Sequence, residues 1–148
     1  MDAVNFFSKE EKALIKSAIQ EAELNTSGEI RVHIENRCKE DVMDRAAWWF
    51  GKLEMHKTEL RNGVLFYLAI KDRKFAILGD GGINAVTPEN FWDDIKEIML
   101  ARFSENEFAE GLREGILMAG EQLKANFPHQ KDDVNELSDD ISFGGKDS

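Results

Sequence analysis

The residues best suited to chemistry in this sequence form a short glycine-rich stretch with one carboxylate. The stretch reads Gly79-Asp80-Gly81-Gly82-Ile83-Asn84. Calcium takes about six to eight oxygen ligands from carboxylates, backbone carbonyls and water, and glycine-rich turns expose carbonyls readily. The stretch therefore indicates a cation site in which Gly79, Asp80 and Asn84 supply oxygens. The alternative is an ordinary turn with one solvated aspartate.

Two further carboxylates join this candidate site through the topology that the sequence predicts. Apolar runs at 64–70 and 75–78 flank a charged break at 71–74, which is typical of an antiparallel hairpin. If the strand at 29–35 pairs parallel with 64–70, Glu29 and Asp80 lie at the same edge of the sheet. Asp93, in the helix that follows, is a further candidate ligand. The alternative for Asp93 is a solvated helix face.

The elements that must position these residues are indicated by hydrophobic periodicity. Residues 64–70 are all apolar or aromatic, which is typical of a central strand covered by helices on both faces. Residues 29–35 alternate apolar and polar side chains, so we expect a strand near the sheet edge with its polar face, His33 included, exposed. A helix between these two strands makes them parallel, joined by a right-handed crossover.

Helices are expected at four places. Ser8 and Glu11 form a capping box, and Leu14 heads the apolar stripe of the helix that they start. Asp41 caps the second helix, Thr87 before Pro88 starts the third, and the fourth runs from 107 to 126. The order of elements predicts an α/β protein, a three-layer α/β/α sandwich with a mixed, Rossmann-like sheet.

Composition limits the classes of partner. The chain has 148 residues, 42% of them hydrophobic, and a net charge of −10. One domain of ordinary size follows, and nucleic-acid binding is excluded because it needs a basic face. No apolar run approaches membrane-spanning length and the first residues carry no basic region, so we expect no membrane insertion and a cytoplasmic location. The single cysteine, Cys38, suits a reducing compartment.

The composition changes after residue 128. Residues 129–148 hold six acidic residues and two lysines with few aromatics, which indicates a flexible acidic tail outside a globular domain of residues 1–128. Apolar residues among the acids at 134–143 are also compatible with a docking segment. The tail is therefore interpreted as solvated, with docking to a protein partner as the alternative.

Other chemistries are less well supported. The glycine-rich stretch lacks the third glycine of a dinucleotide fingerprint, since Asn84 stands there, and it follows a hairpin strand. His33, His56 and His129 show no metal-ligand spacing and are interpreted as surface residues. Cys38 has no catalytic partner signature around it.

Several short motifs together resemble the TPM domain family. They are Thr26-Ser27-Gly28-Glu29-Ile30, Asn62-Gly63-Val64-Leu65, Asp72-Arg73, Gly79-Asp80-Gly81-Gly82-Ile83, Gly111-Leu112 and Gly115-Ile116. The resemblance covers roughly residues 7 to 128 and implies an α/β/α sandwich and, for some members, bound calcium and acid phosphatase activity. Family members often have Gly-aromatic-Gly in the glycine loop, where this chain has Asp80.

Two function classes remain. The first is a calcium-binding interaction or regulatory module whose acidic edge and tail meet an unidentified protein partner. The second is a metal-assisted acid phosphatase, a phosphomonoester hydrolase in which the cation offsets phosphate charge. The net acidity of the chain and the lack of an arginine cluster favour the first class.

Overall fold

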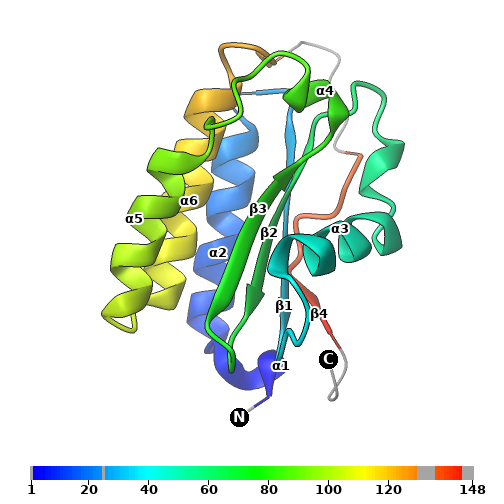
Figure 1. Ribbon diagram of the computed structural model, residues 1–148. Coiled ribbons are helices and arrows are strands. Elements are labelled where there is room, and N and C mark those ends of the chain that lie inside the picture. Colours follow the sequence, from blue (N-terminus) through cyan, green and yellow to red (C-terminus); the bar gives the residue numbers. More distant parts are fainter. Residues whose placement is uncertain (1, 25, 130–135, 145–148) are drawn as a thin grey trace.

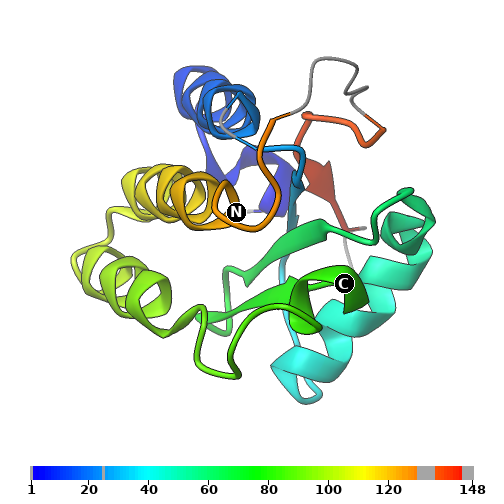
Figure 2. The same ribbon diagram turned by 90° about the horizontal axis from the view of Figure 1, so that it is seen from above.

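The computed structural model describes residues 2–24, 26–129 and 136–144, which form three layers (Figure 1). The sheet has the strand order β3-β2-β1-β4, with strands β1 (Glu29–Glu35), β2 (Gly63–Ala69), β3 (Lys74–Gly79) and β4 (Ser142–Phe143). Helices α2 (Lys9–Glu23), α5 (Asp93–Ser104) and α6 (Phe108–Leu123) lie on one face, and α3 (Val42–Lys52) lies on the other (Figure 2). Three short helices complete the fold: α1 (Ala3–Phe6), η1 (Met55–Lys57) and α4 (Gly81–Asn84). The predicted α/β/α sandwich with a mixed sheet is confirmed.

The strand pairings also agree with the sequence. β1 pairs parallel with β2, with Glu29 opposite Gly63. β2 pairs antiparallel with β3, with Val64 opposite Gly79, and the hairpin turn contains Arg73 at a φ of 52°. The starts of β1 and β2 and the end of β3 therefore lie at one edge of the sheet, as expected.

The central strand is buried along its whole length. All seven residues of β2 are buried. Phe66 belongs to the core between the sheet and helices α2, α5 and α6, and Leu65 and Tyr67 belong to a second core under α3. The unbroken apolar run is explained by this two-sided burial.

Three of the four predicted helix starts are confirmed and one is wrong; α6, expected from 107, begins at Phe108 with Glu107 as its N-cap residue. The Ser8 hydroxyl accepts a hydrogen bond from the Glu11 N–H in a complete capping box, and Asp41 caps α3. The third helix, α5, begins at Asp93 rather than after Thr87. The Thr87 hydroxyl donates to the Ile83 carbonyl, 2.8 Å away, so it is engaged with α4 and does not cap a helix.

Two predicted exposures are wrong. Leu14, expected in the buried stripe of α2, is 38% exposed because it lies at the border of that stripe. His33, expected at the surface, is fully buried, because Trp49 of α3 stacks on its ring and β4 covers the outer edge of β1.

The C-terminal residues add a strand that the sequence did not predict. β4 pairs parallel with β1, with His33 opposite Ser142 and Ile34 opposite Phe143. We call residues 136–144 the C-terminal segment. Within the described part of the chain, no helix is both long enough and apolar enough to cross a bilayer.

The burial of Phe66 predicts a large cost for its truncation. Its ring is fully buried against α6, where a side chain at Gly115 would lie 3.4 Å from it. Phe66→Ala should lower the free energy of unfolding by about 3–5 kcal/mol, measured by urea denaturation. Leu100→Ala, at a position on α5 that is 59% exposed, is the control and should cost less than about 1 kcal/mol. Similar losses for both variants would contradict the central position of β2.

Candidate cation site at the sheet edge

Asp80 lies at the predicted edge but already has a cationic partner. It follows β3 and caps the short helix α4, where its carboxylate accepts a hydrogen bond from the Gly81 N–H at 2.6 Å. The Arg61 guanidinium donates to both carboxylate oxygens, with Nε and Nη2 each 2.9 Å away. A metal ion at Asp80 would therefore have to displace Arg61.

Gly79 and Asn84 are bound to each other. The Asn84 side-chain amide donates to the Gly79 carbonyl at 3.2 Å. Residues 81–84 form a helical turn, so their backbone is not the open loop that the glycines suggested. The hydrogen bond stabilises the end of β3 and engages the Gly79 carbonyl, whereas it uses the side-chain nitrogen of Asn84 and not its oxygen.

Glu29 lies in the same row of the sheet as Asp80, but the two carboxylates do not meet. Glu29 pairs with Gly63, and the Asp80 N–H donates to the carbonyl of Gly63 from the other side. Two strand spacings separate their backbones, about 10 Å. Met55 and Leu137 fill the space next to Gly63. Their atoms lie 3.3 to 3.6 Å from the position that a Cβ atom would occupy at this residue. The structure thus divides the predicted site into two halves.

Asp93 lies apart from both. It is in the first turn of α5 and lines an open hollow with Glu89 and Asn90, all three exposed. Among the described residues, no group of three or more His, Cys, Asp or Glu side chains is close enough to share a metal ion. Any cation site here would need backbone carbonyls and water as further ligands.

Glu29 has an unusual environment for a carboxylate. It is 4% exposed and accepts a hydrogen bond from the Leu137 N–H at 2.8 Å. Burial raises the pKa of Glu29 to about 7, with a smaller contribution from the Glu136 carboxyl group, although hydrogen bonds from the backbone N–H groups of Leu137 and Glu136 oppose this shift. Burial and a hydrogen bond with Asp139 likewise raise the pKa of Glu23 to about 9. Two pairs of carboxyl groups therefore face each other across the contact with the C-terminal segment.

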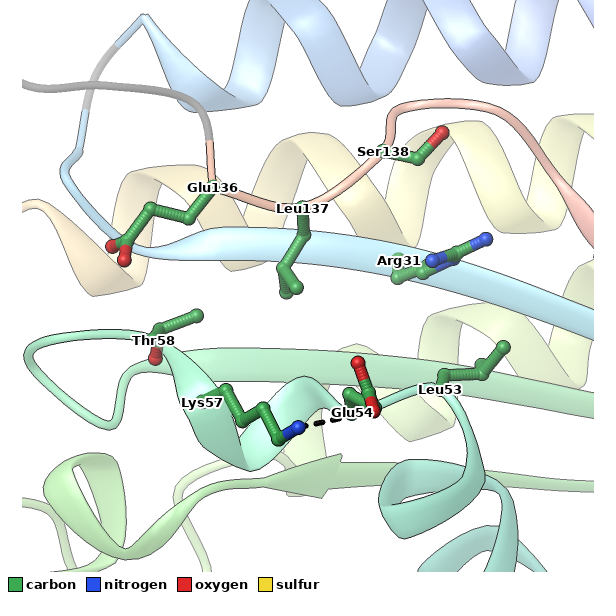
Figure 3. A pocket seen from close by; sticks show the side chains of 8 residues that line it. All are labelled: Arg31, Leu53, Glu54, Lys57, Thr58, Glu136, Leu137 and Ser138. Carbon is green, nitrogen blue, oxygen red and sulfur yellow. Dashed lines mark hydrogen bonds and ion pairs between the residues drawn. The ribbon is translucent and has the colours of Figure 1, made fainter.

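A pocket of about 210 Å³ lies beside Glu136 (Figure 3). Its lining residues come from β1, from the chain after α3 and from the C-terminal segment: Arg31, Leu53, Glu54, Lys57, Thr58, Glu136, Leu137 and Ser138. Lys57 is paired with Glu54, whereas the Arg31 Nε is buried without a hydrogen-bond partner in the described structure. Burial lowers the pKa of Arg31, although the charge of Asp140 opposes this shift.

The sequence did not predict a polar cluster around Glu35 beneath α3. The buried Glu35 carboxylate accepts from Arg45 Nε at 2.9 Å, Arg45 Nη2 at 3.0 Å and Trp49 Nε1 at 3.1 Å, and from the Tyr67 hydroxyl. Burial opposes ionisation, but the Arg45 and Tyr67 hydrogen bonds hold the pKa of Glu35 below its ordinary value. The signal for this cluster was the four-residue spacing of Arg45 and Trp49 on α3, which puts both on the face toward the sheet. Because every Glu35 oxygen has donors, the cluster fixes α3 to the sheet.

The remaining candidates for chemistry stay apart. Burial lowers the pKa of His33 to about 4, so this imidazole is neutral, and its Nδ1 lies 2.9 Å from the Ser142 hydroxyl. His56 and His129 are exposed, as predicted. Cys38 is a buried free thiol beside the Glu40 carbonyl, 3.2 Å away.

The chain was compared with known families and solved structures. Residues 1–122 match the TPM domain. The NMR structure of the BA42 protein from the psychrophilic bacterium Bizionia argentinensis is 47% identical, has a TM-score of 0.89, and the match covers 94% of this chain and 96% of that one. A comparison with curated proteins gave no match.

Two more distant structures share the fold. The N-terminal domain of a protein from P. gingivalis is 19% identical with a TM-score of 0.69, and the match covers 84% of this chain and 82% of that one. The N-terminal domain of the cg2496 protein from Corynebacterium glutamicum is 13% identical with a TM-score of 0.66, covering 85% and 80%. The domain match and the similarity to BA42 agree with the motifs and the fold, and the chain belongs to the TPM domain family.

Proposed function

We propose that this TPM domain is a calcium-binding interaction or regulatory module whose cation lies between Glu29 and Glu136. The observation that supports the proposal is the buried Glu29 carboxyl group, which faces Glu136 and has no basic partner among the described residues. A divalent cation would offset the repulsion between these two groups and favour their charged forms. Glu136 is exposed, so an ion can reach the pair from solvent.

The other predicted ligands fit calcium less well. Asp80 is paired with Arg61, and the Gly79 carbonyl accepts a hydrogen bond from the Asn84 side-chain nitrogen. Asp93 has a free approach from solvent, and with Glu89 it would form a separate, weaker site. The three carboxylates Glu29, Asp80 and Asp93 occupy three different places, so single substitutions can distinguish them.

A cation at Glu29 would act on the C-terminal segment. Glu136 and Leu137 belong to this segment and contact the start of β1 through the Glu29 carboxylate. Binding of the ion would strengthen this contact, and release of the ion would leave two carboxylates facing each other. This coupling supports a regulatory role.

Calcium should stabilise the protein through Glu29. By mass action, a free calcium concentration roughly a hundredfold above the Kd should add about 2.7 kcal/mol to the free energy of unfolding. Glu29→Gln should abolish this gain, whereas Asp80→Asn and Asp93→Asn should retain it. Thermal unfolding of the four proteins, with and without millimolar calcium, measures the difference. Loss of the gain only in Asp80→Asn or Asp93→Asn would assign calcium to that residue instead, and no gain in the wild type would refute the proposal.

The same carboxyl pair predicts how stability depends on pH without metal. The pKa of Glu29 rises from its ordinary value of about 4.5 to about 7 in the folded state. Between these values the folded protein binds more protons than the unfolded chain, so this group lowers stability as pH rises through the window and has no further effect above it. Glu29→Gln should make the fall between about pH 5 and 7 shallower and leave the part that Glu23 contributes, whose pKa rises to about 9, measured by urea unfolding in a chelator at about pH 5, 6, 7 and 8. Glu97→Gln, at an exposed position on α5, should leave the wild-type slope unchanged.

Phosphomonoester hydrolysis is a second candidate, favoured by one observation. Arg31 and Lys57 line the pocket that Glu136 also lines, and the Arg31 Nε is buried without a hydrogen-bond partner in the described structure (Figure 3). A guanidinium in this position can donate to phosphate oxygens. When bound, calcium would offset part of the phosphate charge.

An activity assay tests this second candidate. If the pocket hydrolyses phosphomonoesters, Arg31→Gln should reduce kcat/KM at least about tenfold, since it removes the donor to the phosphate. Arg37→Gln, at an exposed position close in sequence, is the control and should retain activity. Turnover of p-nitrophenyl phosphate, with and without calcium, is the measurement. Activity that survives Arg31→Gln, or no activity in the wild type, would exclude this pocket as the site.

A further inference from the structure

The outer edge of β1 and the neighbouring face of α2 form a surface with three basic side chains and a neutral imidazole, next to the carboxyl groups of Glu23 and Glu29. We call it the β1 edge surface and define it by Lys12 and Lys16 of α2 and Arg31 and His33 of β1. The C-terminal segment lies on this surface beside β1 (Figure 1). The Gly144 N–H donates to the Ile34 carbonyl at 2.9 Å, in addition to the parallel pairing of β4 with β1. An extended chain therefore completes the sheet at this edge.

Each side chain of the segment from Asp140 to Phe143 has a matching group on the protein. Asp140 Oδ1 lies 2.7 Å from Lys16 Nζ. The Ser142 hydroxyl lies 2.9 Å from His33 Nδ1, and the Phe143 ring lies under Lys12 Nζ, 5.2 Å from its centroid. Ile141 packs against the main core. The surface thus contacts an acidic, an apolar, a hydroxyl and an aromatic side chain in this order along the extended segment.

Some features destabilise the contact between the C-terminal segment and the β1 edge surface. The Nε of Arg31 and the Nε2 of His33 are buried without hydrogen-bond partners in the described structure. The carboxyl groups of Glu29 and Glu136 face each other, as do those of Glu23 and Asp139. The ion pair of Lys16 with Asp140 is solvent-exposed, and such pairs contribute about 0–1 kcal/mol. A two-residue ladder held in this way belongs to the least stable parts of a fold.

We infer that the β1 edge surface is a docking site for an extended peptide of a protein partner with the pattern Asp-apolar-Ser-aromatic, and that Asp140–Phe143 of this chain occupies it in cis. Binding would follow strand addition, in which backbone hydrogen bonds supply affinity and alternate side chains supply specificity. The partner of the interaction module proposed above would therefore be a protein that carries such a peptide. The inference rests on the pairing of Lys16 with Asp140 and on the contacts of Ser142 and Phe143 with His33 and Lys12, and it does not require the cation.

Occupation in cis has a measurable consequence. The apparent Kd of a partner peptide equals its intrinsic Kd divided by the fraction of molecules in which the site is open. Weakening the cis segment should therefore tighten binding of a peptide added in trans. Weakening the β1 edge surface should have the opposite effect.

The test uses a fluorescein-labelled peptide with the sequence of residues 136–144, Glu-Leu-Ser-Asp-Asp-Ile-Ser-Phe-Gly, and fluorescence anisotropy in a buffer with chelator. In the full chain, Phe143→Ser removes an anchor of the cis segment and leaves the surface intact, so the peptide should bind at least about tenfold more tightly than to the wild type. Adding Lys16→Glu to this variant should reverse the gain. Adding Lys96→Glu instead, on the distant helix α5, makes the same change of charge and should leave the gain in peptide affinity unchanged.

A charge exchange tests whether the contact of Lys16 with the second aspartate contributes to peptide binding. A peptide with lysine in place of its second aspartate should bind the Phe143→Ser, Lys16→Glu protein more tightly than the original peptide does. A scrambled peptide should bind none of the proteins. Absence of binding to Phe143→Ser at millimolar concentration, or binding that Lys16→Glu leaves unchanged, would overturn the inference.

The experiment is independent of the proposed cation site. The chelator removes calcium, so failure of the calcium prediction does not change the expected result. Conversely, a protein that gains stability from calcium through Glu29 but does not bind the peptide would retain the proposed cation site and lose the docking surface.

Discussion

Burial of β2 on both faces is the constraint on which the rest of the structure depends. All seven residues of this strand are buried, so helices must cover both sides of the sheet. β1 supplies its parallel neighbour and β3 its antiparallel one, which satisfies the backbone hydrogen bonds that burial removes from water. Because of these pairings, β1 and β2 start and β3 ends at the same edge of the sheet. Glu29 and Asp80 lie at this edge.

The second core, under α3, is held differently. Its polar centre is Glu35, which accepts hydrogen bonds from Arg45, Trp49 and Tyr67. Removing a partner of a buried ion pair leaves an uncompensated charge, so such a cluster fixes one arrangement of helix and sheet. The same face of β1 meets the C-terminal segment through Glu29 and His33. Cation binding at Glu29 and peptide docking beside His33 would therefore both act on this segment.

Much of the fold was predictable because local signals and long-range packing agree. The apolar run gave β2, the charged break gave the hairpin, and Ser8 and Asp41 fixed two helix starts. Local signals failed where the same residues make contacts that the sequence pattern did not indicate. Thr87 donates to the Ile83 carbonyl of α4 rather than capping a helix, and Asp140 lies beside β1, where it pairs with Lys16 of α2. Lys16 is far in sequence from Asp140, whereas Ile83 lies only four residues before Thr87.

The sequence by itself determined that the carboxylates of Glu29 and Asp80 lie at one edge of the sheet, because strand direction and hairpin geometry follow from hydrophobic periodicity and turn residues. Only the tertiary structure decided that they do not share a site. Met55 and Leu137 fill the space above Gly63, and Asp80 is paired with Arg61. Side-chain contacts between distant segments have no periodic signal, so the electrostatic environment of each carboxylate appears only after the chain has folded.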